Sequence, residues 1–199
     1  EWNDKGQLEA EKREYLGALL ISKKKLSSLS NEQWQDAWRN YFIDNGIKSL
    51  PWTEEHQQLI ARLQLAFEYH SKQSDTTMSY RTPWLDFSEE ALLADIETWL
   101  MPLLSQCRSQ KSLNKIDLKQ ALMNRLGWDK VSDFEALVPE KIQVPSGSHY
   151  KIDYAQSQPV LAVKLQEMFG YQGKPSICNG QIDLMLHLLS PARRPLQIT

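Results

Sequence analysis

The period of the hydrophobic pattern changes twice along this 199-residue chain, and that change limits the folds it can adopt. Apolar and polar residues alternate over the first two dozen positions, as they do in half-buried strands. From Ser30 onward apolar residues recur at helical spacing, and after Pro139 the strand-like alternation returns. The pattern predicts an α+β fold with an N-terminal β-hairpin, a central helical bundle and a β-rich C-terminal unit.

We expect residues 1–28 to form terminal strands near Gln7–Arg13 and Gly17–Lys23, residues 29–138 a helical domain, and residues 139–199 a small α+β domain. Two strands alone are marginally stable in water. The opening segment is therefore expected to belong to a larger sheet.

Capping residues mark the helix ends. Ser30 followed three positions later by Gln33 is a capping box, and Gly46 ends the same amphipathic segment. Further helices are expected after Thr53, Ser88 and Asp117 and over residues 130–139, with Leu103 facing inward near the bend at Pro102. The polar stretch Ser71–Pro83 is expected to be a flexible connection.

The C-terminal unit is predicted to have the order β-β-α-β-β. "KIQVPSGSHYKIDY" is expected to be a hairpin, and "QPVLAVKLQEMFG", with Pro159 in its first turn and Gly170 at its end, a short helix with Phe169 facing inward. "QIDLMLHLLS" is expected to be a strand against which "PLQIT" pairs back, with an arginine pair in the connecting loop.

Composition excludes several classes of protein. Twenty-three Lys and Arg against 25 Asp and Glu give a net charge of −2, so the chain lacks the basic excess of a stand-alone nucleic-acid-binding protein. Contact with nucleic acid would need a local patch. The longest apolar runs are shorter than the roughly 18 residues that a membrane span requires, and no membrane partner is expected. Cys107 and Cys178 match no paired pattern and are expected to be reduced thiols of a cytoplasmic protein.

No motif for nucleotide hydrolysis is present in these 199 residues, because there is no G-x-x-x-x-G-K-[ST] run. The four histidines are dispersed over different expected elements, so no metal site is expected. Ser146 or Ser148 with His149 has the residue types of a nucleophilic site. The same residues are ordinary hairpin residues, and that interpretation is favoured.

Arg193 and Arg194 stand between two prolines in the last expected loop. A planar guanidinium binds phosphate or carboxylate through two parallel hydrogen bonds. Lys151 and Lys164 could complete a small basic surface that contacts nucleic-acid phosphates. Alternatively, an internal carboxylate such as Asp153 or Asp183 could bind one of the arginines, and the pair would then stabilise the fold.

Aromatic residues are abundant, with seven tryptophans. Trp34, Trp38 and Trp99 fall on helical core stripes, and Trp52 and Trp84 each follow a proline just before a helix, where they are expected to fix helix entry. We therefore expect tryptophans to serve the core rather than to stack on bases. The lysines at 23–25 are expected to end a strand in solvent.

Five stretches together resemble one known family. They are "LPWTEEHQQLIARLQ", "DFSEEALLADIETWL", "VPSGSHYKIDY", "PVLAVKLQEMFG" and "LHLLSPARRPLQIT". In this order they resemble the C-terminal region of the bacterial HrpB-type ATP-dependent helicases, DEAH-box relatives of the RNA helicase A class. The likeness covers nearly the whole chain.

The resemblance implies a parent protein with two RecA-like motor domains, then winged-helix, helical-bundle and OB-like modules, followed by this region. The opening strands would be the end of the OB-like module, and the chain a fragment of its parent. ATP and Mg²⁺ are expected only in the motor domains. None of the residues that bind them has a counterpart here.

The expected function is that of a non-catalytic accessory region of an ATP-dependent RNA helicase. It would contribute binding of single-stranded RNA or other nucleic acid through Arg193, Arg194, Lys151 and Lys164. The alternative is a protein-docking platform that contacts the motor domains of the same helicase or another protein partner.

Overall fold

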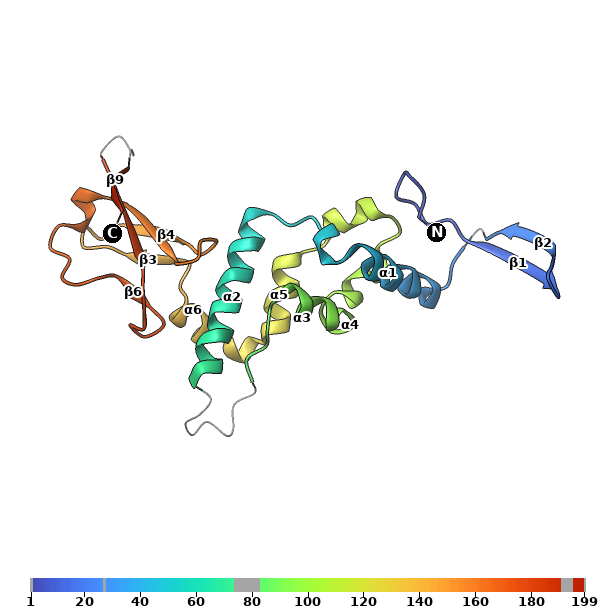
Figure 1. Ribbon diagram of the computed structural model, residues 1–199, viewed down its shortest axis with the longest axis horizontal. Coiled ribbons are helices and arrows are strands. Elements are labelled where there is room, and N and C mark those ends of the chain that lie inside the picture. The colour runs from blue at the N-terminus through green and yellow to red at the C-terminus, as the bar shows by residue number, and fades with distance from the viewer. Residues whose placement is uncertain (1, 27, 74–82, 191–194, 199) are drawn as a thin grey trace. The chain divides into compact units, whose positions relative to one another are not determined.

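The computed structural model describes residues 2–26, 28–73, 83–190 and 195–198 and confirms the mixed helix and strand content (Figure 1). Contacts divide the chain into two compact units. Unit 1 comprises Glu1–Trp52 and Glu89–Arg125, and unit 2 comprises Thr53–Ser88 and Leu126–Thr199. Each unit takes residues from two separate stretches of the sequence. No helix among the described residues is long and apolar enough to cross a membrane.

Unit 1 begins with a hairpin of β1 (Glu11–Leu16) and β2 (Leu19–Lys25), paired antiparallel. The hairpin was expected, but its strands start later than the alternation indicated. Gln7 instead forms an isolated bridge with Ser109, and Gly17, at φ +61°, lies in the turn. A positive φ favours glycine and is not strand geometry, so the second strand cannot begin there.

The first long helix, α1 (Asn31–Asn45), has the predicted capping box. The Ser30 hydroxyl accepts from the Gln33 backbone N–H at 3.2 Å, and the Gln33 side-chain oxygen accepts from the Ser30 N–H at 2.9 Å. Gly46 ends the helix as expected, at φ +67°. Trp38 and Phe42 are buried on the inward stripe, as predicted.

The remaining helices of unit 1 are short: η1 (Ile47–Ser49), α3 (Glu89–Ala94), α4 (Ile96–Trp99), η2 (Met101–Gln106), η3 (Gln110–Lys115) and α5 (Leu118–Leu126), whose last residue belongs to unit 2. The helix expected after Ser88 is broken at Asp95. Leu103 is 38% exposed, so its predicted inward position is wrong. The 3₁₀ geometry of η2 has three residues per turn, which rotates Leu103 away from the α-helical stripe.

Indole N–H groups in the core of unit 1 have backbone partners. Trp38 Nε1 donates to the Cys107 carbonyl at 3.2 Å, and Trp99 Nε1 donates to the Leu92 carbonyl at 2.8 Å. Buried tryptophans need such acceptors, because an unpaired N–H away from water destabilises the fold. The largest fully buried side chains of this unit are Trp38, Phe42, Leu92, Leu100, Leu104, Leu118 and Leu122.

Unit 2 contains α2 (Glu54–Gln73), η4 (Trp128–Lys130) and α6 (Val131–Leu137). Arg62 of α2 is 6% exposed and lies 4.7 Å from the centroid of the Phe134 ring. Its Nε donates to the Val138 carbonyl at 2.8 Å, and its terminal nitrogen lies 2.7 Å from the Glu135 carboxylate. These contacts hold α6 against α2.

The sheet of unit 2 has the order β3-β4-β5-β8-β9, formed by β3 (Lys141–Gln143), β4 (His149–Asp153), β5 (Val160–Lys164), β8 (Met185–Leu189) and β9 (Pro195–Ile198). The β5–β8 pair is parallel, and the other neighbours are antiparallel. The short strands β6 (Ser176–Ile177) and β7 (Ile182–Asp183) form a separate hairpin. The predicted hairpin at β3 and β4 and the return of the last strand are confirmed (Figure 1).

The helix predicted over Pro159–Gly170 is wrong. Residues 160–164 are strand β5, followed by one 3₁₀ turn, η5 (Leu165–Met168). β5 is the central strand of the sheet, and both Leu161 and Val163 are fully buried. A continuous apolar run looks the same in a buried strand and in a helix, so periodicity alone did not separate the two.

Two predictions fall wholly or mainly on positions that the structure does not describe. Residues 74–82 of the expected flexible connection Ser71–Pro83 lie outside the described residues. Arg193 and Arg194 lie in 191–194, which is also outside them.

Candidate nucleic-acid interface

One face of the unit 2 sheet collects lysines from three strands. Lys141 of β3 and Lys151 of β4 are direct cross-strand partners, and both are exposed. Asp153 of β4 is paired with Val160 of β5, and residues two apart along a strand share a face. Lys151 precedes Asp153 by two residues and Lys164 follows Val160 by four, so both lysines lie on this face. The structure brings together two of the four residues that the sequence indicated.

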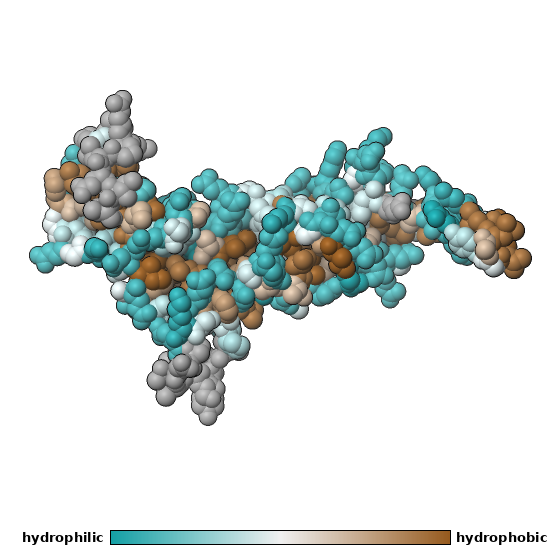
Figure 2. All heavy atoms as spheres, viewed as in Figure 1, coloured by the Kyte–Doolittle hydropathy of each residue, from teal (hydrophilic) through white to brown (hydrophobic). Residues whose placement is uncertain are grey.

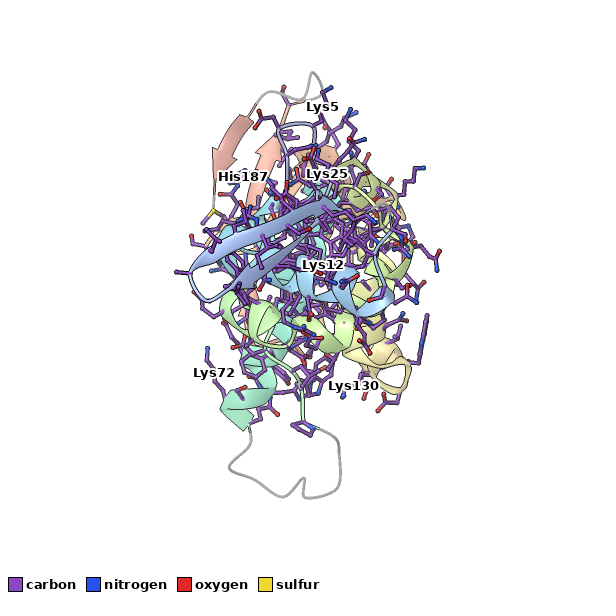
Figure 3. The ribbon with its side chains drawn as sticks, turned by 90° about the vertical axis from the view of Figure 1, so that its right-hand side faces the viewer. Lys5, Lys12, Lys25, Lys72, Lys130 and His187 are labelled. Carbon is purple, nitrogen blue, oxygen red and sulfur yellow. The ribbon has the colours of Figure 1, made fainter. Side chains whose placement is uncertain are left out.

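Histidines share this face. His149 is two positions from Lys151 on β4, and His187 of β8 is the parallel partner of Ala162 on β5. Figure 3 labels His187 on the C-terminal sheet. We call the face formed by Lys141, His149, Lys151, Ala162, Lys164 and His187 the lysine face. The opposite face of the same strands buries Ile152, Leu161 and Val163.

The lysine face is closed at one end. Gln58 of α2 donates to the Asp153 carboxylate at 2.5 Å and accepts from the Tyr154 backbone N–H at 2.7 Å. The hydrogen bond from Gln58 is the main cause that lowers the pKa of Asp153, and the charge of His187 contributes to the same shift. Asp153 is therefore a hydrogen-bonded carboxylate at the covered edge of this face.

Two further carboxylates lie near the lysines. Glu140 is 3.4 Å from the Lys151 ammonium, and both side chains are more than half exposed. Glu167 of η5 accepts from the Ser146 hydroxyl, and this bond, together with those from Ser148 and Tyr150 and the charge of Lys164, lowers its pKa. These neighbours reduce the net positive potential, so this face can contribute only a few phosphate contacts.

The cations of the β1–β2 hairpin, in unit 1, are differently arranged. Lys23 and Arg13 are 3.0 and 3.1 Å from Glu11, and Lys12 is 2.9 Å from Glu14. Lys12 and Lys25 are labelled in Figure 3. The lysines at 23–25 end β2 in solvent, as expected. The ion pairs of Lys12, Lys23 and Lys25 lie within the hairpin or its flanking residues.

The alternative site at Ser146, Ser148 and His149 has no nucleophilic geometry. The Ser146 hydroxyl donates to Glu167, and Ser146 Oγ accepts from the Ser148 backbone N–H at 3.3 Å. A serine nucleophile needs a hydrogen bond to its base, and His149 does not supply one here. Among the described residues, no group of three or more His, Cys, Asp or Glu side chains could hold a metal ion.

Trp38 and Trp99 lie in the core, as predicted, whereas Trp128 is 67% exposed. Trp52 stacks on Trp99 with ring centroids 6.4 Å apart, and Trp84 stacks on His70 at 4.3 Å. Trp34 is half-buried, and the Arg108 guanidinium lies 5.1 Å from its ring. The exposed aromatic side chains instead include Phe169, which sequence periodicity had placed in the core.

Sequence reasoning missed Lys141, His149 and His187 as members of this face. Lys141 could have been found, because a hairpin with its turn at residues 145–147 sets 141 opposite 151. His187 could not. It reaches the face through the parallel pairing of β5 with β8, which no local pattern encodes.

Comparison with known proteins places residues 99–199 within the family described as "ATP-dependent helicase C-terminal" (HrpB_C). Over its whole length the chain is 38% identical to the ATP-dependent RNA helicase HrpB of Escherichia coli strain K12. It resembles the solved structure of the E. coli DExH-box NTPase HrpB with a TM-score of 0.79 at 38% identity, and a second structure, of the E. coli DEAH/RHA helicase HrpB, at 0.77 and 35%. The alignments with this relative and with the two solved structures cover all of this chain, but only 24% of the matched protein.

Proposed function

The chain belongs to the HrpB_C family of ATP-dependent helicase C-terminal regions, and from this premise we propose that it contributes nucleic-acid binding to an ATP-dependent RNA helicase. It does so without a catalytic site of its own. The partner is single-stranded RNA or another nucleic acid, bound through phosphates. ATP and Mg²⁺ belong to the motor domains of the parent, a cytoplasmic DEAH-box protein.

The observation that carries this proposal is the opposed pair Lys141 and Lys151, with Lys164 on the same face. Ammonium groups displace condensed counterions from a nucleic-acid backbone, and this release drives binding without reading sequence. Three lysines give a weak site, detectable at low salt. Arg193 and Arg194 extend the same function as proposed phosphate contacts.

The experiment is fluorescence anisotropy of a labelled single-stranded RNA at low salt. We expect the triple variant Lys141→Ala/Lys151→Ala/Lys164→Ala to bind at least about tenfold more weakly than the unaltered chain, since fewer ammonium groups on phosphates release fewer counterions. The matched control is Lys12→Ala/Lys24→Ala, which removes another cross-strand lysine pair, in the β1–β2 hairpin. Equal losses of affinity in both variants would assign binding to general charge. An unchanged triple variant would overturn the role of this face.

The arginines are tested separately. Arg193→Ala/Arg194→Ala is expected to weaken RNA binding while leaving the thermal midpoint unchanged. A lowered midpoint with unchanged binding would instead favour an internal carboxylate partner.

A second candidate function, docking to the motor domains of the same helicase, is favoured by the β1–β2 hairpin. Its apolar side chains are largely exposed, namely Tyr15, Leu16, Leu19, Leu20 and Ile21. Figure 2 shows a brown, hydrophobic patch at the end of this hairpin. Clustered apolar surface of this kind is typical of a protein contact. The relatives extend well beyond the quarter of their length that this chain spans. We propose the corresponding remainder of the parent protein as the partner.

Docking is tested with the parent's motor fragment, expressed without this region, as the captured protein. Capture that survives high salt and disappears in Leu16→Ser/Leu19→Ser supports docking, because apolar contact is not screened by salt. Failure to capture the motor fragment contradicts it.

A further inference from the structure

Phe169 is a large apolar side chain that lies 68% exposed directly after η5. Its exposure follows from the local fold, in which residues 160–168 form a strand and one 3₁₀ turn instead of an amphipathic helix. Leu165, on the same turn, is also exposed. An exposed phenyl ring contributes little to the stability of unit 2, since the hydrophobic gain comes from area removed from water. Its ring is available to a ligand.

The turn that carries Phe169 is ordered by its own contacts. Glu167 accepts from the Ser146 hydroxyl, which ties η5 to the β3–β4 turn. The Phe169 N–H donates to the Gln166 carbonyl at 3.4 Å, and the Tyr171 N–H donates to the Met168 carbonyl at 3.0 Å. The backbone that carries Phe169 therefore has little conformational freedom to lose on binding.

Phe169 also lies near the lysine face. Lys164 is the last residue of β5, and η5 is all that separates it from Phe169 in the chain. Five residues at the 3₁₀ rise span roughly 10 Å, which equals about three stacked nucleotide steps. The start of β4 at His149 and the end of β8 at Leu189 meet β5 at this same end of the sheet. One short strand of nucleic acid can therefore reach both the ring and the ammonium groups.

We propose that Phe169 stacks on an unpaired base of a single-stranded nucleic acid whose phosphates contact Lys164 and the lysines beside it. This inference rests on the proposed nucleic-acid function and names its substrate class. A single strand presents flat bases beside regularly spaced phosphate charges. This arrangement matches the exposed Phe169 ring beside the lysines. Bases in a duplex already stack on each other and cannot offer a free face to Phe169. A sequence-tolerant platform for single strands follows, because every base has a π-face.

The test compares three fluorescent ligands of equal length on the whole chain: a single-stranded RNA, its blunt duplex, and an abasic strand that keeps only sugars and phosphates. We expect Phe169→Leu to weaken binding of the single strand by about 5- to 150-fold, as stacking on one base requires. Phe169→Leu is expected to bind the abasic strand as tightly as the unaltered chain does. The salt dependence of its affinity is also expected to be unchanged. Phe169→Tyr retains a ring and restores single-strand affinity.

A matched control is Leu165→Ala, which removes another exposed apolar side chain of the same turn and is expected to leave single-strand affinity unchanged. Single-strand binding by Phe169→Leu that equals the unaltered chain overturns stacking while leaving the lysine face intact. Equal losses of affinity for the abasic strand also overturn it, because they indicate a distorted turn. If the unaltered chain binds none of the three ligands at low salt, both the proposed function and this inference are contradicted.

Discussion

Lys141 and Lys151 lie directly opposite each other on adjacent antiparallel strands, with both ammonium groups exposed. Like charges in this position destabilise a sheet, whereas an opposite charge would stabilise it. Glu140, 3.4 Å from Lys151, offsets only part of the repulsion. An anion bound between the two ammonium groups would offset the rest of it.

The first prediction separates stability from binding at this pair. Lys141→Glu is expected to raise the free energy of unfolding by about 0.2–1 kcal/mol, because it replaces cross-strand repulsion by attraction. RNA affinity falls at the same time. Urea unfolding and anisotropy measure the two effects. Lys24→Glu, which faces Lys12 on the β1–β2 hairpin, is the control and should leave RNA affinity unchanged. Lower stability of Lys141→Glu would contradict the account of the pair.

The second prediction concerns the buried guanidinium of unit 2. Arg62→Leu is expected to lower the free energy of unfolding by about 2–3 kcal/mol, since it leaves the Val138 carbonyl without its donor and removes a charged hydrogen bond to Glu135. Glu135→Gln should have a smaller effect, because the Glu135 side chain is half exposed and its partner keeps the Val138 bond. Urea denaturation compares them. Equal losses of stability would show that the ion pair, not the carbonyl contact, dominates.

Acid stability supplies a third prediction. The pKa of Asp153 is lowered in the folded chain, chiefly by the hydrogen bond from Gln58. A carboxyl whose folded pKa lies below its unfolded value stabilises the fold above the unfolded pKa, and this contribution is lost as pH falls through the folded pKa. Stability should therefore decrease as pH drops below about 4. In Asp153→Asn the decrease should be shallower, as followed by urea unfolding between pH 5 and pH 3. An unchanged pH dependence in that variant would exclude Asp153 as a contributor.

Thiol reactivity gives a fourth prediction. Cys107 and Cys178 are free and buried, and burial raises the pKa of Cys178 to about 11. Since only the thiolate reacts, Cys178 should resist a disulfide reagent at pH 8 in the folded chain. Cys107 should also stay unlabelled, because its side chain is buried, and both should be labelled in urea. Mass spectrometry of labelled peptides identifies each site. Rapid labelling of Cys178 without denaturant would contradict its position in the core.

Local signals predicted local structure. The capping pair Ser30 and Gln33 and the turn residues between β3 and β4 each act over a few positions, and both were confirmed. Asp117 also accepts from the Gln120 N–H at 2.8 Å at the start of α5, as expected for a cap. These features depend on hydrogen bonds within a single turn, so the sequence contains all of their partners.

Nonlocal structure was not predictable in this way. Val160–Lys164 became a strand because β4 and β8 flank it and its Leu161 and Val163 are buried, which is a property of the sheet and not of the segment. The same error placed Phe169 in the core. In the candidate site, the sequence indicated Lys151 and Lys164 individually. Their position on one face depends on the register between separate strands. Their role in binding stays a prediction.

The most direct measurement of the central claim is the salt dependence of single-stranded RNA binding. If three lysines of the sheet contact phosphates, a plot of log affinity against log salt should have a contribution of about −2 from them, at roughly −0.7 per phosphate neutralised. The triple variant Lys141→Ala/Lys151→Ala/Lys164→Ala should lack that contribution, whereas Lys12→Ala/Lys24→Ala should keep it. A slope that is the same in the triple variant and in the unaltered chain would contradict a nucleic-acid interface on this face.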